Sequence, residues 1–194
     1  MVAVLAVSCT GAGGTDGIKP LPEETTTTHT AGPSYSVPAV IDGTYVDRVL
    51  AALDQVEGDA VRRLVASREV DDESVARLRA IYNDPFFEVF RTSMLEVAAK
   101  GVEQYEKPPG NRRTTVSELL AANPNCILIT AKTDYTAVVI DPPADDPNTD
   151  FLVTLRRSQA DADPEDLNPT PWSYGAAEVV RRGDRPPPDA ACNE

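Results

Sequence analysis

The spacing of apolar residues changes once along the chain, from a helical period before Gly101 to an extended period after Arg113. In residues 44–67 apolar side chains recur every three or four positions, which is the period of one helix face. In residues 126–181 β-branched residues alternate with others, and prolines separate the segments. Because helices come first and strands follow, we predict an α+β fold in which N-terminal helices pack on a curved antiparallel sheet.

Three helices are expected before residue 101. The first covers residues 44–67 and places its charged side chains on the face opposite the core. Those side chains are Asp47, Arg48, Asp54, Arg62 and Arg63. The second lies within residues 69–83, where Asp71 or Asp72 is expected to be the N-cap.

The third helix is predicted to begin after Asp84, with Pro85 at its first position, and to end at Gly101. Its large apolar face is more typical of core packing than of a ligand site. That face consists of Phe87, Phe90, Met94, Leu95, Val97 and Ala98.

Strands are expected in the second half of the chain. Residues 114–122 fit either a strand or a turn of helix. Residues 126–140 fit either one long bent strand or a hairpin that turns at 132–134. Residues 150–158 and 171–181 are predicted to be the remaining strands, with Phe151, Val153 and Leu155 on one face.

The charge and the scarcity of histidine exclude several classes of function. Lys and Arg total 18 against 31 Asp and Glu, so the net charge of -13 disfavours a nucleic-acid partner. The single histidine, His29, lies in the Thr-rich segment expected to be a tether, so neither a nucleophile–histidine triad nor a histidine-based metal site is expected. The acidic stretch around Asp141, Asp145, Asp146 and Asp150 lacks the ligand register of a calcium-binding loop. We therefore expect no metal site and no cofactor.

The opening "MVAVLAVSCTGAGG" could be read as a strand and a phosphate-binding turn or as the end of an export signal. A dinucleotide-binding turn needs a third glycine where this chain has Asp16, and it needs a helix to follow. Pro20 and Pro22 prevent that helix. The nucleotide-binding interpretation therefore fails.

The stretch "LAVSC" resembles the bacterial lipobox, in which a peptidase cuts before a cysteine that then carries lipid. The resemblance implies that residues 1–9 are a signal remnant and that Cys9 is the lipid attachment site. Residues 10–39, which have no apolar period, are then a flexible tether, and residues 40–194 form a single α+β domain. The expected location is the outer face of the cell membrane. The alternative is a cytosolic N-terminus with an incidental cysteine.

The two remaining cysteines, Cys126 and Cys192, form an even pair once Cys9 is set aside, as expected for a domain that folds in an oxidising compartment. Their spacing fits no zinc motif and no redox motif. We predict a disulfide between them, with two unrelated thiols as the alternative.

The order of a long helix followed by a curved sheet is similar to the cystatin-like and NTF2-like cone folds. The strings "CILITAKTDYTAVV" and "NPTPW", with a cysteine near the end, resemble a set of uncharacterised secreted actinobacterial lipoproteins. The resemblance covers most of the chain between Val40 and Cys192. It bears on fold and compartment and implies no activity.

Two functions remain open. The favoured one is a lipid-anchored binding or structural domain without catalytic activity, whose partner beyond the membrane is a protein or a small apolar ligand. The alternative is an NTF2-like acid–base enzyme with an Asp base and a Tyr donor. Residues that could line a pocket of such a cone are Asp134, Tyr135, Trp172 and Tyr174.

Overall fold

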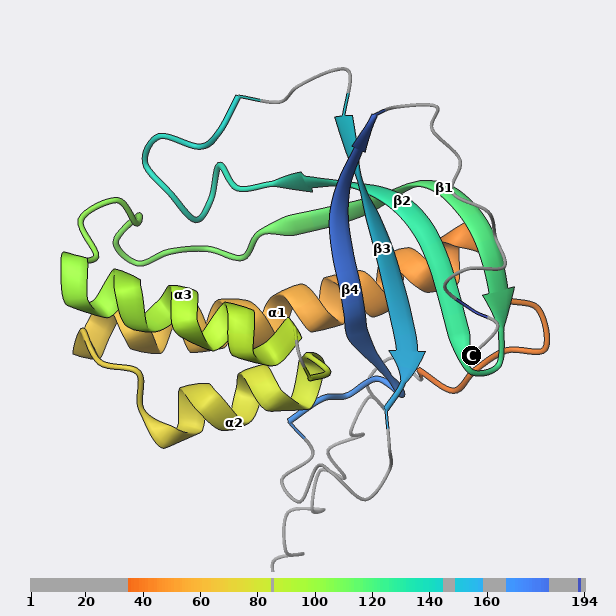
Figure 1. Ribbon diagram of the computed structural model, residues 1–194, viewed down its shortest axis with the longest axis horizontal. Coiled ribbons are helices and arrows are strands. Elements are labelled where there is room, and N and C mark those ends of the chain that lie inside the picture. The colour runs from red at the N-terminus through yellow and green to blue at the C-terminus, as the bar shows by residue number, and fades with distance from the viewer. Residues whose placement is uncertain (1–34, 85, 145–148, 159–166, 182–191, 193–194) are drawn as a thin grey trace, which may run out of the picture. The chain divides into compact units, whose positions relative to one another are not determined.

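Among the residues that the structure describes, three helices come before four strands, as the apolar periodicity predicts. The computed structural model describes residues 35–84, 86–144, 149–158 and 167–181, together with Cys192. The elements are α1 (Gly43–Ser67), α2 (Asp72–Ile81), α3 (Phe86–Lys100), β1 (Arg113–Asn123), β2 (Cys126–Asp134), β3 (Thr149–Arg157) and β4 (Trp172–Arg181). The predicted α+β class is confirmed, and Figure 1 shows α1 crossing behind the sheet.

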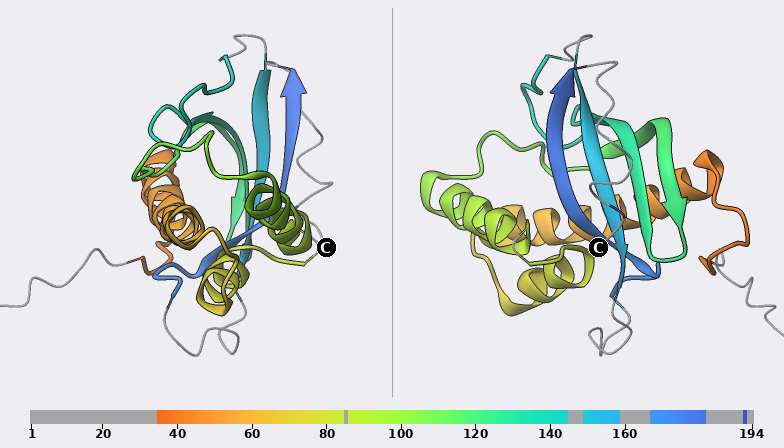
Figure 2. Two further views of the ribbon diagram at one scale, coloured as in Figure 1. Left: turned by 90° about the vertical axis from the view of Figure 1, so that its left-hand side faces the viewer. Right: turned by 45° about the vertical axis from the view of Figure 1, so that its right-hand side comes forward.

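The four strands form one antiparallel sheet in the order β1-β2-β3-β4. Ile127 lies opposite Leu155 and Ile129 opposite Val153, so these buried residues share the face that packs on the helices. Two register shifts interrupt β1, and such bulges bend a strand. The two further views in Figure 2 show this curvature.

The β1–β2 hairpin turns at Pro124 and Asn125, and this corrects one prediction. Residues 114–122 are a strand. The proposed turn at 132–134 is wrong, because these residues pair with β1 as far as Asp134. A single strand over 126–140 is also wrong, because Val138 N–H donates to the Tyr135 carbonyl at 2.8 Å and the chain turns away.

Helix α1 begins at the N-cap Asp42, whose carboxylate accepts from the Tyr45 N–H at 2.8 Å. Its predicted apolar face is buried in the core. That face includes Val46, Val49, Leu50, Leu53, Val56, Ala60 and Leu64. One predicted surface residue is placed differently: Asp54 is only 2% exposed. Hydrogen bonds from Arg112 and Thr114 explain why a charged side chain is buried at this position of the helix.

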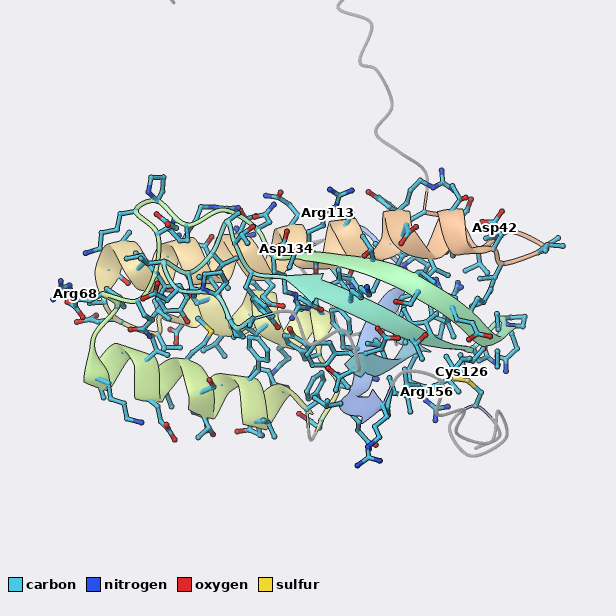
Figure 3. All side chains as sticks on the ribbon, turned by 90° about the horizontal axis from the view of Figure 1, so that it is seen from above. Asp42, Arg68, Arg113, Cys126, Asp134 and Arg156 are labelled. Atoms are coloured by element: carbon cyan, nitrogen blue, oxygen red, sulfur yellow. A yellow bond between two sulfur atoms is a disulfide. The ribbon has the colours of Figure 1, made fainter. Side chains whose placement is uncertain are left out.

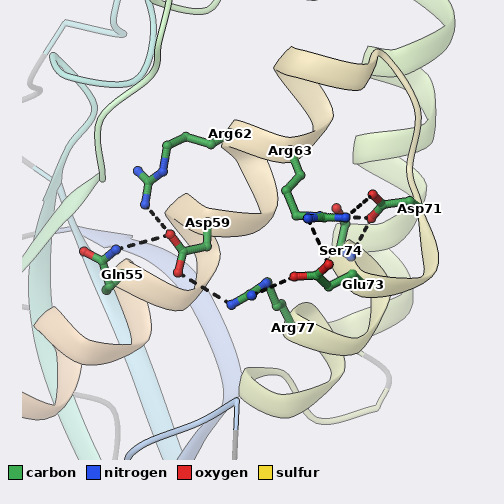
Figure 4. A network of polar contacts seen from close by, with 8 residues as sticks. All are labelled: Gln55, Asp59, Arg62, Arg63, Asp71, Glu73, Ser74 and Arg77. Carbon is green, nitrogen blue, oxygen red and sulfur yellow. Dashed lines mark hydrogen bonds and ion pairs between the residues drawn. The ribbon is translucent and has the colours of Figure 1, made fainter. Parts of the chain in front are cut away.

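Helix α2 begins at Asp71, which settles the choice between the two predicted caps. The Asp71 carboxylate accepts from the Ser74 N–H at 2.8 Å and pairs with Arg63 of α1 at 2.7 Å. The Arg63 guanidinium, followed by the Ser74 N–H, holds the pKa of Asp71 well below its usual range. Figure 4 shows the wider network of ion pairs that joins α1 to α2. These pairs are exposed to solvent, so each adds little stability.

Helix α3 ends at Gly101, whose φ of 113° is left-handed and favours glycine, as predicted. Phe87 and Met94 of its predicted apolar face are buried. Leu95 is 43% exposed, so its expected burial is wrong. The predicted helical position of Pro85 lies outside the described residues.

The predicted disulfide is confirmed: Cys126 is bonded to Cys192, with 5.5 Å between their Cα atoms. It joins the first residue of β2 to the chain beyond β4. The predicted lipid site Cys9 and the tether as far as residue 34 lie outside the described residues. No helix in the described part of the chain combines the length and the apolar character needed to span a membrane.

Candidate functional site

The four residues predicted to line a pocket do not share one. Trp172 is fully buried in the core, where its Nε1–H donates to the Tyr45 hydroxyl at 2.8 Å. Tyr174, two residues further along β4, is also buried and lies beside a polar cluster. Asp134 and Tyr135 lie instead at the end of β2, where they line a surface groove.

Asp134 is exposed and belongs to a turn. Its carboxylate accepts from the Thr136 N–H at 2.8 Å, and this hydrogen bond, with help from nearby Arg113, lowers the pKa of Asp134. Arg113 lies opposite Asp134 in the β1–β2 ladder, and Figure 3 labels both at the same end of that ladder. Turn formation accounts for Asp134 without any catalytic role.

The most unusual group of side chains is a buried ionic cluster that joins α1 to β1. The Arg112 Nε lies 2.8 Å from Asp54 Oδ1, and the Arg112 Nη2 lies 2.7 Å from Glu57 Oε2. The side chains of Arg112, Asp54 and Glu57 are 12%, 3% and 7% exposed, respectively. Two carboxylates and one guanidinium thus share a space with little water.

Hydrogen bonds from the protein satisfy both carboxylates. Asp54 accepts from the Thr114 N–H at 2.6 Å, from the Thr114 hydroxyl at 3.1 Å and from the Tyr174 hydroxyl at 3.3 Å. Glu57 accepts from the Tyr82 hydroxyl. Buried charges need such partners, because each unpaired polar atom costs free energy.

Burial and charge shift several pKa values in the cluster. Burial raises the pKa of Glu57, although Arg112 and Tyr82 oppose the shift. Burial also raises the pKa of Tyr82 and of Tyr174 well above the usual range, with Arg112 again opposing it. For Arg112, burial acts to lower the pKa, but Glu57 and the other neighbours outweigh it, so the net shift is upward. The guanidinium is therefore charged.

Two spaces adjoin this cluster within the described part of the chain. The larger, of about 430 Å³, is lined in part by Asp54, Arg112 and Thr114, but the Asp54 side chain is only 3% exposed. The smaller, a cavity of about 20 Å³, lies between Glu57, Arg112 and Tyr135. That volume holds one water molecule at most. The hydroxyl of the half-buried Tyr135 accepts a hydrogen bond from the Arg112 guanidinium. We interpret the cluster as a structural link between helix and sheet.

The raised pKa of Glu57 predicts a pH dependence of stability. Because the folded state favours the protonated form, Glu57 contributes stability that is present below its unfolded pKa and is lost as pH rises through its folded pKa. The charged groups around it are Arg112 and Asp54, and the neutral, titratable ones are the phenols of tyrosines 82, 105, 135 and 174. We expect the stability of wild type relative to Glu57→Gln to fall as pH rises from about 4.5.

Urea unfolding of both proteins across that pH range measures the difference. Carboxylates that do not interact with Glu57, such as Asp71, titrate equally in both proteins and cancel on subtraction. A difference that stays constant, or that grows with pH, would contradict the raised pKa.

A second candidate site is an open groove at the end of the sheet where β2 ends and β3 begins. Its volume is about 880 Å³, within the usual range for ligand sites. Its walls are Arg113 and Thr115 of β1, residues 131–136, residues 142–144 and residues 149–151. We call it the fork groove, because β2 and β3 diverge there (Figure 1).

Comparison with known proteins assigns no function: no family model, curated protein or solved structure matches the chain. Within the described residues, no three His, Cys, Asp or Glu side chains are grouped so that they could hold a metal ion. Sequence reasoning missed the partnership of Asp54, Glu57 and Arg112. The one available signal was a carboxylate at residue 57, between two apolar positions of the helical period.

Proposed function

We propose that the chain is an extracytoplasmic, lipid-anchored domain that binds a ligand rather than transforming one. The observation that carries this proposal is the bond between Cys126 and Cys192, since structural disulfides are typical of oxidising compartments. The lipobox-like "LAVSC" supports an anchor at Cys9 on the outer face of the membrane. The fork groove supports a binding role, with a protein segment or a small apolar ligand as the partner.

An acid–base enzyme of NTF2-like type is the second candidate, because the fold does bring an aspartate and a tyrosine together. The Tyr174 hydroxyl lies 3.3 Å from Asp54. General acid–base catalysis requires both groups to reach one substrate atom. A pocket of about 430 Å³ adjoins Asp54, but the Asp54 side chain is only 3% exposed and its oxygens already accept from Thr114 and Arg112. The binding role therefore has more support.

Intact mass spectrometry of the protein purified from its own host tests the compartment and the anchor. We expect a chain that begins at Cys9 and carries lipid, with the mass of two hydrogens missing for the bond between Cys126 and Cys192. Alkylation without reduction should then add nothing. A Cys9→Ser variant should lose the lipid and keep the disulfide.

Two results would overturn the proposal. One is an unmodified chain that begins at Met1. The other is alkylation of both Cys126 and Cys192 in protein that was never reduced.

A further inference from the structure

The fork groove exposes part of a strand edge inside the sheet. Strand β2 pairs with β1 as far as Asp134, but it pairs with β3 only as far as Ala131. The last three residues of β2, 132–134, thus have a strand neighbour on one side only. In a strand, alternate residues direct their N–H and C=O to the same side. At least one of these three residues directs both groups into the groove.

These backbone groups form no hydrogen bond to β3, in so far as the described residues show. An unpaired strand edge offers main-chain hydrogen bonds to an incoming extended chain, which is a common mode of peptide recognition. A small apolar ligand would leave these groups to water. The edge therefore favours a peptide over the other candidate ligand.

The side chains near the open edge of β2 provide surface that an extended peptide can contact. Thr133 and Phe151 are half-buried in the walls of the groove, as is Tyr135 at its end. Phe151 lies opposite Ala131, two residues from Thr133, so Phe151 and Thr133 give partly apolar surface to one face of the sheet. Such surface can hold every second side chain of an extended segment, because successive side chains point to opposite faces.

Among the described residues that line the groove, one cation is available to pair with a ligand. Arg113 lies opposite Asp134 in the β1–β2 ladder, and the two charges offset each other. Lys132 is exposed, lies opposite the neutral Thr115 and makes no salt bridge with any described residue. Asp150 also lines the groove, but it is 7% exposed and engaged within the protein. Lys132 is thus placed to meet a carboxylate.

We propose that the fork groove binds an extended peptide segment of a partner protein, which adds to the edge of β2 and places one carboxylate against Lys132. This inference rests on the proposed binding function and names its ligand class. The net charge of -13 makes a second copy of this chain a poor occupant. It does not prevent local pairing at Lys132, because salt screens distant charges beyond about 8 Å at physiological ionic strength.

The test titrates the full ¹⁵N-labelled chain with pools of acetylated, amidated hexapeptides that alternate Thr and Val. One pool has a central Glu, a second has a central Lys, and a third repeats the first with alternate amides N-methylated. We expect the Glu pool to shift the amide signals of residues 131–136 and 149–151. It should bind about fivefold to tenfold more tightly than the Lys pool. N-methylation should abolish binding, because it removes the main-chain donors.

Matched variants test the role of the cation. Lys132→Glu should reverse the preference between the Glu and Lys pools. Lys100→Glu replaces another exposed lysine, on α3 and outside the groove lining, and should leave the preference unchanged. Both sites are exposed, so both variants are expected to fold. Equal binding by the N-methylated pool, or shifts confined to another surface, would overturn the peptide proposal.

An anionic aromatic dye, anilinonaphthalene sulfonate, which has no main-chain amides, separates this proposal from the one on which it rests. If the dye shifts the groove signals and no peptide pool does, the groove binds ligands but the peptide class is wrong. If neither the dye nor the peptides shift them, the binding function fails as well. The mass test of the anchor and disulfide is independent of both outcomes.

Discussion

Replacement of Arg112 by alanine is expected to lower the free energy of unfolding by about 3–5 kcal/mol, a large part of the stability of a domain of this size. Arg112 is the only cation paired with Asp54 and Glu57 among the described residues. Without it two buried carboxylates face each other with no opposing charge. Urea unfolding of both proteins at neutral pH measures the loss.

The exposed neighbour Arg113 provides the matched control, because Arg113→Ala removes the same side chain from the next position without uncovering a buried charge. Its effect should be within about 0.5 kcal/mol. Should Arg112→Ala fail to fold, Arg112→Lys keeps the charge but loses the second contact, and it should show a smaller loss. The double variant Arg112→Ala with Glu57→Gln should recover part of the stability. Equal losses for Arg112→Ala and Arg113→Ala would show that the cluster contributes nothing.

This cluster also marks the limit of what could be predicted from the sequence. Helix positions were predictable because local periodicity reports burial, and the apolar face of α1 is in the core as expected. Asp54 departs from that rule because its partner Arg112 lies 58 residues further along the chain. Periodicity describes one element at a time. It carries no information about which charge a distant segment will bring.

The fork groove was hidden for a related reason. Alternation of side chains continues through Thr133 without a break, so no local signal marks the point where β3 leaves β2. Asp134 and Tyr135 were predicted as pocket residues from their chemistry and do line the groove. Trp172 was predicted on the same grounds, but its indole is fully buried. Chemistry identified candidate side chains, and only the register of the sheet determined which of them face open space.

The disulfide could be predicted from the sequence, because that prediction needs only the number of cysteines and no knowledge of packing. Once Cys9 is assigned to lipid, one pair remains, and the structure joins that pair. The same count is consistent with the proposed extracytoplasmic location, where the bond would stay oxidised and would keep Cys192 attached to β2. The stability of the domain should therefore depend on the redox state of its surroundings.

Loss of the disulfide is expected to destabilise the protein by roughly 4 kcal/mol. The bond closes a separation of 66 residues, and the chain-entropy model assigns about this value to a loop of that length. Cys192→Ser is the cleaner variant, because Cys192 is only half-buried whereas Cys126 is 1% exposed, so a serine at 126 would also bury a hydroxyl. A Cys9→Ser background prevents exchange with the third thiol. Urea unfolding of the two proteins measures the loss.

The reducing agent supplies an internal control for this prediction. Reduction should lower the stability of the Cys9→Ser protein to about that of the variant that also lacks Cys192, and it should leave that second variant unchanged. This comparison separates loss of the covalent bond from any effect of the serine side chain. If reduction and substitution both leave the unfolding midpoint where it was, the bond does not constrain the unfolded chain. The stability of the fold would then give no support to the proposed oxidising compartment.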